Sequence, residues 1–248
     1  MSRFGAEKSS LKSAQLDAVH RMLSLNDDGG HDNGGMGKMG AQAYNDAPAG
    51  TSYNQWKILV YDKPCRSIIS PLLSVPQLRS RGVTLHLLIS SSTEREPIPD
   101  VPAVYFVEPT RANLQIIAQD CAKRLYSKVH INFVTKLDRS LMEEFGKLIV
   151  QNNCLDMIAS LHDQYLDFIC LEKNLFSLSN QMDSYALMNK SGVTDNVMEK
   201  YLDDIAYGLL SVVGTSGSVP VVRCPKVSCC YWSSICAFHE TGIYLFSF

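Results

Sequence analysis

The fold of this 248-residue chain is constrained most by an alternation of short apolar runs with longer amphipathic segments, which begins at Trp56. The apolar runs are rich in Val, Ile, Leu and aromatic residues: WKILVYD (56–62), TLHLLIS (84–90), AVYFVE (103–108), VHINFV (129–134) and YLDFICL (165–171). Nearly continuous apolar runs are typical of strands buried on both faces of a parallel sheet. The segments between them have helical patterns: 65–73, 110–126, 138–151 and a short helix from about residue 156. We therefore expect an α/β fold with a parallel, doubly wound sheet flanked by helices.

The sequence divides into five parts. In chain order they are an amphipathic N-terminal helix (1–27), a Gly-rich flexible linker (28–53), a first α/β domain (54–163), the start of a second α/β domain (164–226) and a Cys- and aromatic-rich tail (227–248). The second domain has a helix at 194–213, capped by Thr194 and stopped by Gly214 and Gly217, and a strand at 219–225. These elements cannot close a sheet alone, so we expect the second α/β domain to be incomplete.

The composition excludes two broad classes of protein. Hydrophobic residues make up 46% of the chain, which is enough for a sizeable core and excludes a wholly disordered chain. The 23 Lys and Arg residues nearly balance the 25 Asp and Glu residues, so the basic excess of a nucleic-acid-binding protein is missing. The first residues contain no apolar signal segment, and no uncharged apolar run is long enough to span a membrane. We therefore expect an intracellular protein without a direct membrane span.

Two patterns bear on nucleotide or enzyme chemistry. Residues 35–40 read GMGKMG, but they precede the first strand, whereas a dinucleotide site needs a strand before its glycines. Asp62 ends the first strand, where doubly wound enzymes place their sites, and there it could hold a metal ion or a ribose. Capping of the next helix, with Pro64 in its first turn, explains Asp62 as well. The alternative is an enzyme with a site around Asp62, Ser90 and Glu108 at the strand ends.

The histidines and cysteines indicate no metal centre. His86 and His130 lie in the middle of predicted buried strands, where a hydrogen-bonded core histidine is the usual finding. The pair His162–Asp163 resembles a metal-phosphohydrolase dyad, but the additional ligands are missing. Soft ligands that zinc would accept gather near the end of the chain, without a CxxC spacing: Cys224, Cys229, Cys230, Cys236 and His239. We predict no catalytic residue, no metal and no cofactor.

The helix at 138–151 carries an apolar stripe of Leu141, Phe145 and Leu148, with Met142 and Ile149 beside it. Packing on the sheet explains most of this width. Gly146 lies on the shoulder next to Met142 and leaves a shallow hollow. A second apolar helix, with Ile158 and Leu161 at i and i+3, is expected to follow. Two such helices make a groove that could receive a short partner helix.

Three segments resemble the SM (Sec/Munc) family of SNARE regulators, and its Sly-like branch of endoplasmic reticulum–Golgi transport in particular. They are YDKPCRSIISPLLSVPQLRSRGVTLHLLI, DVPAVYFVEPTRANLQIIAQD and YLDFICLEKNLFSL, and the opening LKSAQLDAVHRMLSLN is similar too. The resemblance covers residues 11–226 and implies a first domain with a parallel sheet flanked by helices. It places a syntaxin-peptide pocket at Met142, Phe145, Gly146, Ile158 and Leu161. Gly146 replaces the alanine expected from the family pattern, and Met142 replaces a leucine.

The resemblance implies a non-enzymatic protein of vesicle docking and fusion between the endoplasmic reticulum and the Golgi. Its partners would be the N-terminal peptide of a Golgi-type syntaxin and SNARE complexes, bound by a monomer on the cytosolic face of these membranes. Family members are more than twice as long, so we expect a C-terminally truncated form that retains syntaxin binding. The tail at 227–248 resembles nothing in the family. An enzyme with a site near Asp62 is the competing hypothesis.

Overall fold

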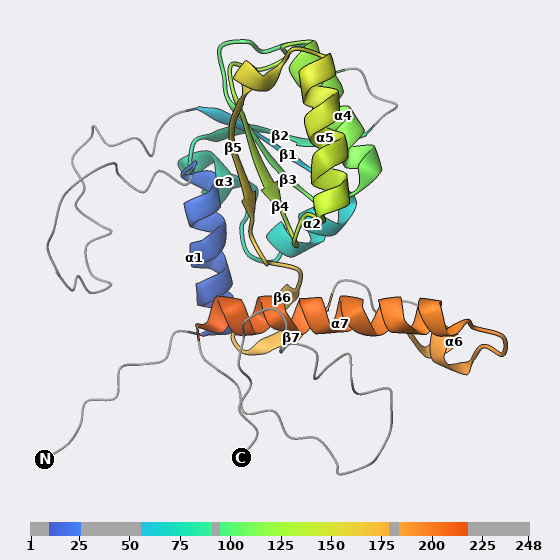
Figure 1. The fold of residues 1–248 in the computed structure, drawn as a ribbon. Helices are drawn as coiled ribbons and strands as arrows, with labels where there is room; N and C mark the ends of the chain where they lie inside the picture. Colours follow the sequence, from blue (N-terminus) through green and yellow to red (C-terminus); the bar gives the residue numbers. More distant parts are fainter. Residues whose placement is uncertain (1–9, 26–55, 91–94, 179–183, 218–248) are drawn as a thin grey trace, which may run out of the picture.

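The computed structural model describes residues 10–25, 56–90, 95–178 and 184–217 (Figure 1). The predicted linker, the strand predicted at 219–225 and the tail lie outside the described residues. The same holds for the GMGKMG segment and for the Cys/His cluster near the end of the chain. Within the described residues, no helix combines the length and the apolar character needed to cross a membrane.

Five parallel strands form the main sheet in the order β2-β1-β3-β4-β5. In chain order the strands are β1 (Lys57–Tyr61), β2 (Val83–Leu88), β3 (Ala103–Val107), β4 (Val129–Phe133) and β5 (Ile158–Asp163). All residues of β1 and β3 are buried, and so is most of β4. The parallel sheet flanked by helices is confirmed, and the strand order reverses between β1 and β3, as in doubly wound folds.

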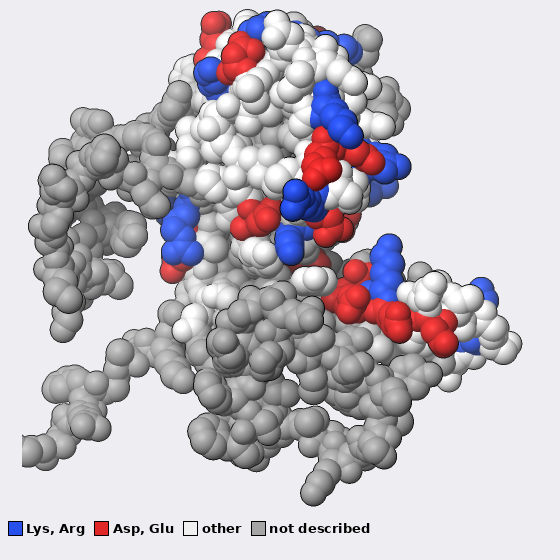
Figure 2. All heavy atoms as spheres, in the orientation of Figure 1, with Lys and Arg blue, Asp and Glu red and all other residues white. Residues whose placement is uncertain are grey.

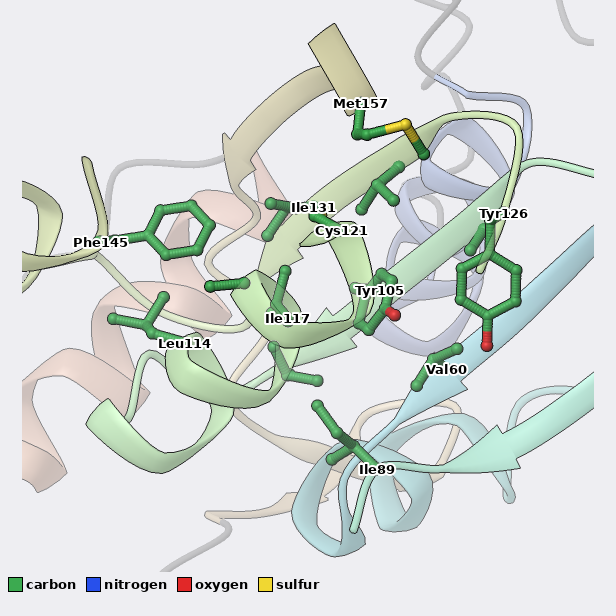
Figure 3. Packing of buried hydrophobic residues seen from close by; sticks show 14 of the residues in the cluster. Val60, Ile89, Tyr105, Leu114, Ile117, Cys121, Tyr126, Ile131, Phe145 and Met157 are labelled. Carbon is green, nitrogen blue, oxygen red and sulfur yellow. The ribbon is translucent and has the colours of Figure 1, made fainter. Parts of the chain in front are cut away.

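Helices cover both faces of the sheet (Figure 1). On one face, α4 (Arg111–Ala122) and α5 (Arg139–Gln151) pack on a cluster that includes Tyr105, Ile117 and Phe145 (Figure 3). On the other face, α1 (Leu11–Leu23), α2 (Lys63–Ile69) and α3 (Val75–Ser80) close a second core. The helix predicted at 65–73 corresponds to α2, which ends at Ile69 because Pro71 has no N–H with which to continue it, and α3 was not predicted.

Two expectations for strands were wrong. Strand β2 was expected to be buried on both faces, but it is an edge strand whose Thr84, Leu85 and His86 are exposed. The helix expected from residue 156 is only a 3-10 turn at Leu155–Met157, and the following residues form the edge strand β5. Ile158 and Leu161 are three residues apart yet share one face of the sheet, because the pairing of β4 with β5 shifts register between Val129 and His130, so their spacing resembled that of a helix.

The strand predicted at 165–171 was also placed wrongly. Only its end is a strand, β6 (Ile169–Glu172), and it pairs antiparallel with β7 (Leu175–Ser177) outside the main sheet. Leu166 and Phe168 are nevertheless fully buried in the core beneath α1. Their burial comes from packing of a connecting segment rather than from a sheet, and an apolar run alone does not distinguish the two.

The remaining elements are α6 (Ser184–Asn189) and the long helix α7 (Asp195–Ser216). Helix α7 begins after Thr194 as predicted and ends at Gly217, whose φ of 63° is the left-handed conformation that favours glycine. Gly214, expected to help stop the helix, lies inside it. Helix α1 packs against α7 and β6, so it bridges the main sheet and the later elements.

Three contacts hold α1 in this position. The side chain of Gln15 donates from Nε2 to the carbonyl of Phe168 (2.7 Å), and Lys57 donates from Nζ to the carbonyl of Leu23 (2.6 Å). The guanidinium of Arg81 lies 3.3 Å from Nδ1 of His20. Since Gln15 and Lys57 are both buried, these polar contacts satisfy groups that would otherwise be costly to remove from water.

Candidate functional site

The predicted peptide pocket falls on α5 and on β5, the outermost strand of the sheet. Phe145 is 4% exposed and belongs to the core cluster on this face, and Ile158 and Leu161 pack against the same cluster. Leu161 pairs with Ile131 of β4, which also belongs to that cluster, so its side chain shares the sheet face covered by α5. The structure thus brings Phe145, Ile158 and Leu161 to one apolar region, although β5 is a strand and not the expected helix.

The other two predicted residues form the surface of this region. Met142 is 46% exposed, and Gly146 is one helical turn further along α5. A Cβ atom added to Gly146 would meet no atom within 4 Å, so the helix surface is open there. Met142 and Gly146 are four residues apart and therefore adjacent on the helix. Together they provide an exposed apolar side chain beside an open position on the helix surface.

One apolar residue on this surface was missed by the sequence reasoning. Val150 is 71% exposed and follows Gly146 by four residues, so Met142, Gly146 and Val150 form one row along α5. The i, i+4, i+8 spacing in the sequence is the signal that could have found it. The row extends the small apolar surface toward the end of α5.

Polar contacts fix α5 relative to its neighbours. Arg111 of α4 binds Glu144 with two hydrogen bonds, from Nη2 (2.6 Å) and Nε (2.8 Å), and Arg139 binds Glu143 one turn later (3.1 Å). Both pairs are exposed and contribute little to stability. The pair of Arg111 and Glu144 joins α5 to α4, whereas the pair of Arg139 and Glu143 lies within α5. On β5, Ser160 Oγ lies 2.9 Å from His130 Nδ1 of the adjacent strand. Within the described part of the chain, no strand pairs with the outer edge of β5.

A cavity of about 230 Å³ lies on the other flank of α5, between this helix and α4. It is lined by Arg111, Leu114, Phe145 and Leu148, among others. Phe145 therefore borders this cavity as well as the apolar region near β5.

Of the alternative site at the strand ends, Asp62 is engaged in structural contacts. Asp62 Oδ1 accepts from the N–H of Cys65 (3.0 Å) and caps α2. Its Oδ2 accepts from the N–H of Glu108 (2.7 Å) and from Nδ2 of Asn113 (3.0 Å). The capping role of Asp62 is confirmed, and both of its oxygens are used. In the residues described, no group of three His, Cys, Asp or Glu side chains could hold a metal ion.

The two strand histidines have different surroundings. His86 was expected in the core, but it is exposed and its ring stacks on Tyr61 with 6.2 Å between ring centroids. It is exposed because β2 has no neighbour on its outer side in the described structure. His130 is half-buried and contacts Ser160, in line with a hydrogen-bonded histidine of the sheet. Asp163 accepts from the N–H of Leu137 (3.3 Å) and so stabilises the turn before α5.

Comparisons with known proteins point in one direction. The model of the Sec1 family matches residues 57–237. The SEC1 family transport protein SLY1 of Arabidopsis thaliana is 40% identical over 217 residues, which are 87% of this chain and 31% of that protein. The Sec1 family domain-containing protein 1 of Homo sapiens is 43% identical over 174 residues, which are 69% of this chain and 27% of that protein. The chain spans about a third of the length of the curated relatives that it matches.

Solved structures share the fold. The structure of Sly1p in complex with an N-terminal peptide of Sed5p superposes with a TM-score of 0.79 at 33% identity. The superposed part is 95% of this chain and 38% of the Sly1p chain. The structure of the SM protein Vps45 in complex with the Qa SNARE Tlg2 has a TM-score of 0.70 at 19% identity over 96% of this chain and 37% of that one. The second likeness concerns the fold alone.

Proposed function

The chain belongs to the Sec1 family, and on this premise we propose that it binds the N-terminal peptide of a Golgi-type syntaxin. Through that partner it regulates SNARE-mediated docking and fusion of vesicles between the endoplasmic reticulum and the Golgi. The observation that carries the proposal is the likeness to Sly1p, whose structure was solved with an N-terminal peptide of Sed5p. This likeness covers 95% of the chain at 33% identity, well above a match of fold alone.

The peptide occupies the surface of Met142, Phe145, Gly146, Ile158 and Leu161. A short amphipathic peptide places one aromatic or aliphatic side chain in the hollow beside Gly146, where it contacts Met142 and reaches the partly buried side chains of β5. Burying such an anchor contributes about 1.5–3 kcal/mol, which suits a reversible interaction. The edge of β5 offers backbone groups to an extended part of the peptide.

The protein acts by binding and carries no catalytic activity of its own. Asp62, the residue on which the enzyme alternative depended, caps α2 and contacts Glu108 and Asn113 instead of facing a substrate. The site of action is the cytosolic face of endoplasmic reticulum and Golgi membranes, where the syntaxin partner holds the protein.

The test is a titration of a fluorescent syntaxin N-terminal peptide with the full chain, followed by anisotropy. Met142→Arg and Gly146→Arg place a charged side chain in the hollow, and each is expected to weaken binding at least tenfold, which corresponds to about 1.4 kcal/mol. Val75→Arg is the matched control, because Val75 is 44% exposed, close to the 46% of Met142, and lies on α3, which packs through Leu78 on the other face of the sheet. Equal binding by all three variants would contradict the pocket.

A further inference from the structure

A polar crevice separates α7 from the end of the sheet. This cavity of about 340 Å³ opens where β3 and β4 end, and α7 forms its opposite wall. We name it the carboxylate crevice after four of its lining residues; with the two lysines that also line it, these are Glu108, Asp138, Asp167, Asp204, Lys136 and Lys200. Figure 2 shows acidic side chains gathered along α7, with a basic side chain among them.

The carboxylates come from both walls of the crevice. Glu108 follows β3, and its position is fixed because its backbone N–H donates to Asp62 (2.7 Å). Asp138 begins α5, and Asp167 precedes β6. Asp204 reaches the crevice from α7 and is half-buried. Carboxylates that meet in a partly dehydrated space repel one another more strongly than they would in water.

The positive groups compensate this repulsion only in part. Lys136 and Lys200 line the same crevice, but both are exposed and so remain largely hydrated. Lys200 lowers the pKa of Asp204, yet burial outweighs it and the pKa of that carboxyl is raised. Tyr207 is the other titratable group that α7 contributes to the crevice. The contact between α7 and the sheet therefore holds more negative than positive charge.

We propose that uptake of one proton in the carboxylate crevice controls how tightly α7 docks against the main sheet. With the proton bound, Glu108 is neutral and the two walls close. Without it, the carboxylates of Glu108, Asp167 and Asp204 repel one another and α7 loosens. Since α7 also packs against α1, loosening reaches the helix that bridges the two parts of the structure.

The direction of the pH dependence follows from Glu108. Burial, with Asp62, Asp167 and Asp204 as further causes, raises its pKa from 4.5 to about 7. When α7 leaves, water enters and Asp204 recedes, so the pKa of Glu108 falls toward its ordinary value. The docked state therefore binds the proton more tightly, and docking strengthens as the pH falls through about 7. If α7 accounts for one pKa unit of this shift, the docking equilibrium changes about fivefold between roughly pH 8 and pH 6.

Hydrogen–deuterium exchange of the full chain at pH 6 and pH 8 tests this, after correction for the intrinsic pH dependence of exchange. Protection of amides 195–216 is expected to be about fivefold higher at pH 6, relative to amides 129–133 of β4. Glu108→Gln, which mimics the protonated side chain, should show the same high protection at both pH values. Glu96→Gln removes an exposed carboxylate elsewhere and should behave as the unmodified chain.

Two results would overturn the proposal. One is equal protection of α7 at pH 6 and pH 8 in the unmodified chain, and the other is an unchanged pH response in Glu108→Gln. Should circular dichroism show that Glu108→Gln is unfolded, Asp204→Asn decides, because it removes the α7 carboxylate without touching the sheet. A reduced pH response in Asp204→Asn supports the proposal, and a full response contradicts it.

Discussion

The ammonium group of Lys57 donates a hydrogen bond to the carbonyl of Leu23 across 2.6 Å, at the end of α1. Lys57 is 1% exposed although it begins a strand of the central sheet. A cation at the carboxyl end of a helix also interacts favourably with the helix dipole. The contact brings the end of α1 to the start of β1, although 33 residues lie between them in the sequence. It is thus a tertiary attachment of the N-terminal helix to the sheet.

Lys57→Met should loosen α1, since it leaves the carbonyl of Leu23 without its buried donor. The expected loss is about 1–3 kcal/mol of unfolding free energy, measured from urea denaturation followed by circular dichroism. Lys123, which is exposed at the C-terminal end of α4, provides the control, and Lys123→Met should leave the midpoint of the urea transition unchanged. A Lys57→Met protein as stable as the unmodified chain would show that Leu23 finds another donor.

A second prediction concerns Asp120, which accepts from Oη of Tyr105 (2.7 Å) and pairs with Arg95 (2.7 Å). The side chains of Arg95 and Asp120 are only 7% and 6% exposed. Asp120→Ala leaves a buried guanidinium without its counter-charge, so we expect a loss of about 3–5 kcal/mol in unfolding free energy. The exposed pair of Arg124 and Asp156 is the comparison, and Asp156→Ala should cause no comparable loss. Similar losses of unfolding free energy in both variants would show that burial does not decide the cost of removing the carboxylate.

The interior of the sheet could be predicted from the sequence, and its edges could not. Strands β1, β3 and β4 are covered on both faces, so their residues are apolar without alternation and the runs are recognisable. The run of β2 looks the same, but its exposure depends on its place at the edge of the sheet, which is decided by the order of distant strands. Strand β5 has a register irregularity against β4, so the spacing of its apolar residues resembled that of a helix.

The candidate site divides in the same way. The shoulder of Met142, Phe145 and Gly146 could be predicted because it depends only on the periodicity of α5. The contribution of Ile158 and Leu161 required the register of β5 against β4, with its irregularity at His130, and this register is a tertiary property. The attachment of α1 through Gln15 and Lys57 carries no local sequence signal, because the partners of both are carbonyl groups of distant segments.

Gly146→Ala should stabilise the chain. The added Cβ meets no atom within 4 Å, and alanine in an exposed helix interior is favoured over glycine by about 0.8–1 kcal/mol. Gly208→Ala in α7 is the matched control, because its Cβ would lie 2.9 Å from Cδ2 of Leu178 and the gain should be reduced or reversed. Thermal unfolding of the two variants separates them. A destabilised Gly146→Ala protein would mean that the hollow on α5 is occupied.

The last prediction is that acid weakens the contact between α1 and the turn that holds Arg81. Burial, and then the charge of Arg81, lowers the pKa of His20 below its ordinary value of 6.5, whereas Asp17 raises it. The unfolded chain therefore takes up this proton more readily, so the stabilising contribution of neutral His20 is present above pH 6.5 and is lost as the pH falls below it.

His20→Gln keeps an acceptor for Arg81 but cannot be protonated. Unfolding free energy measured between about pH 7 and pH 5 should fall less steeply in His20→Gln than in the unmodified chain. Identical slopes for the two proteins would exclude His20 as the titrating group.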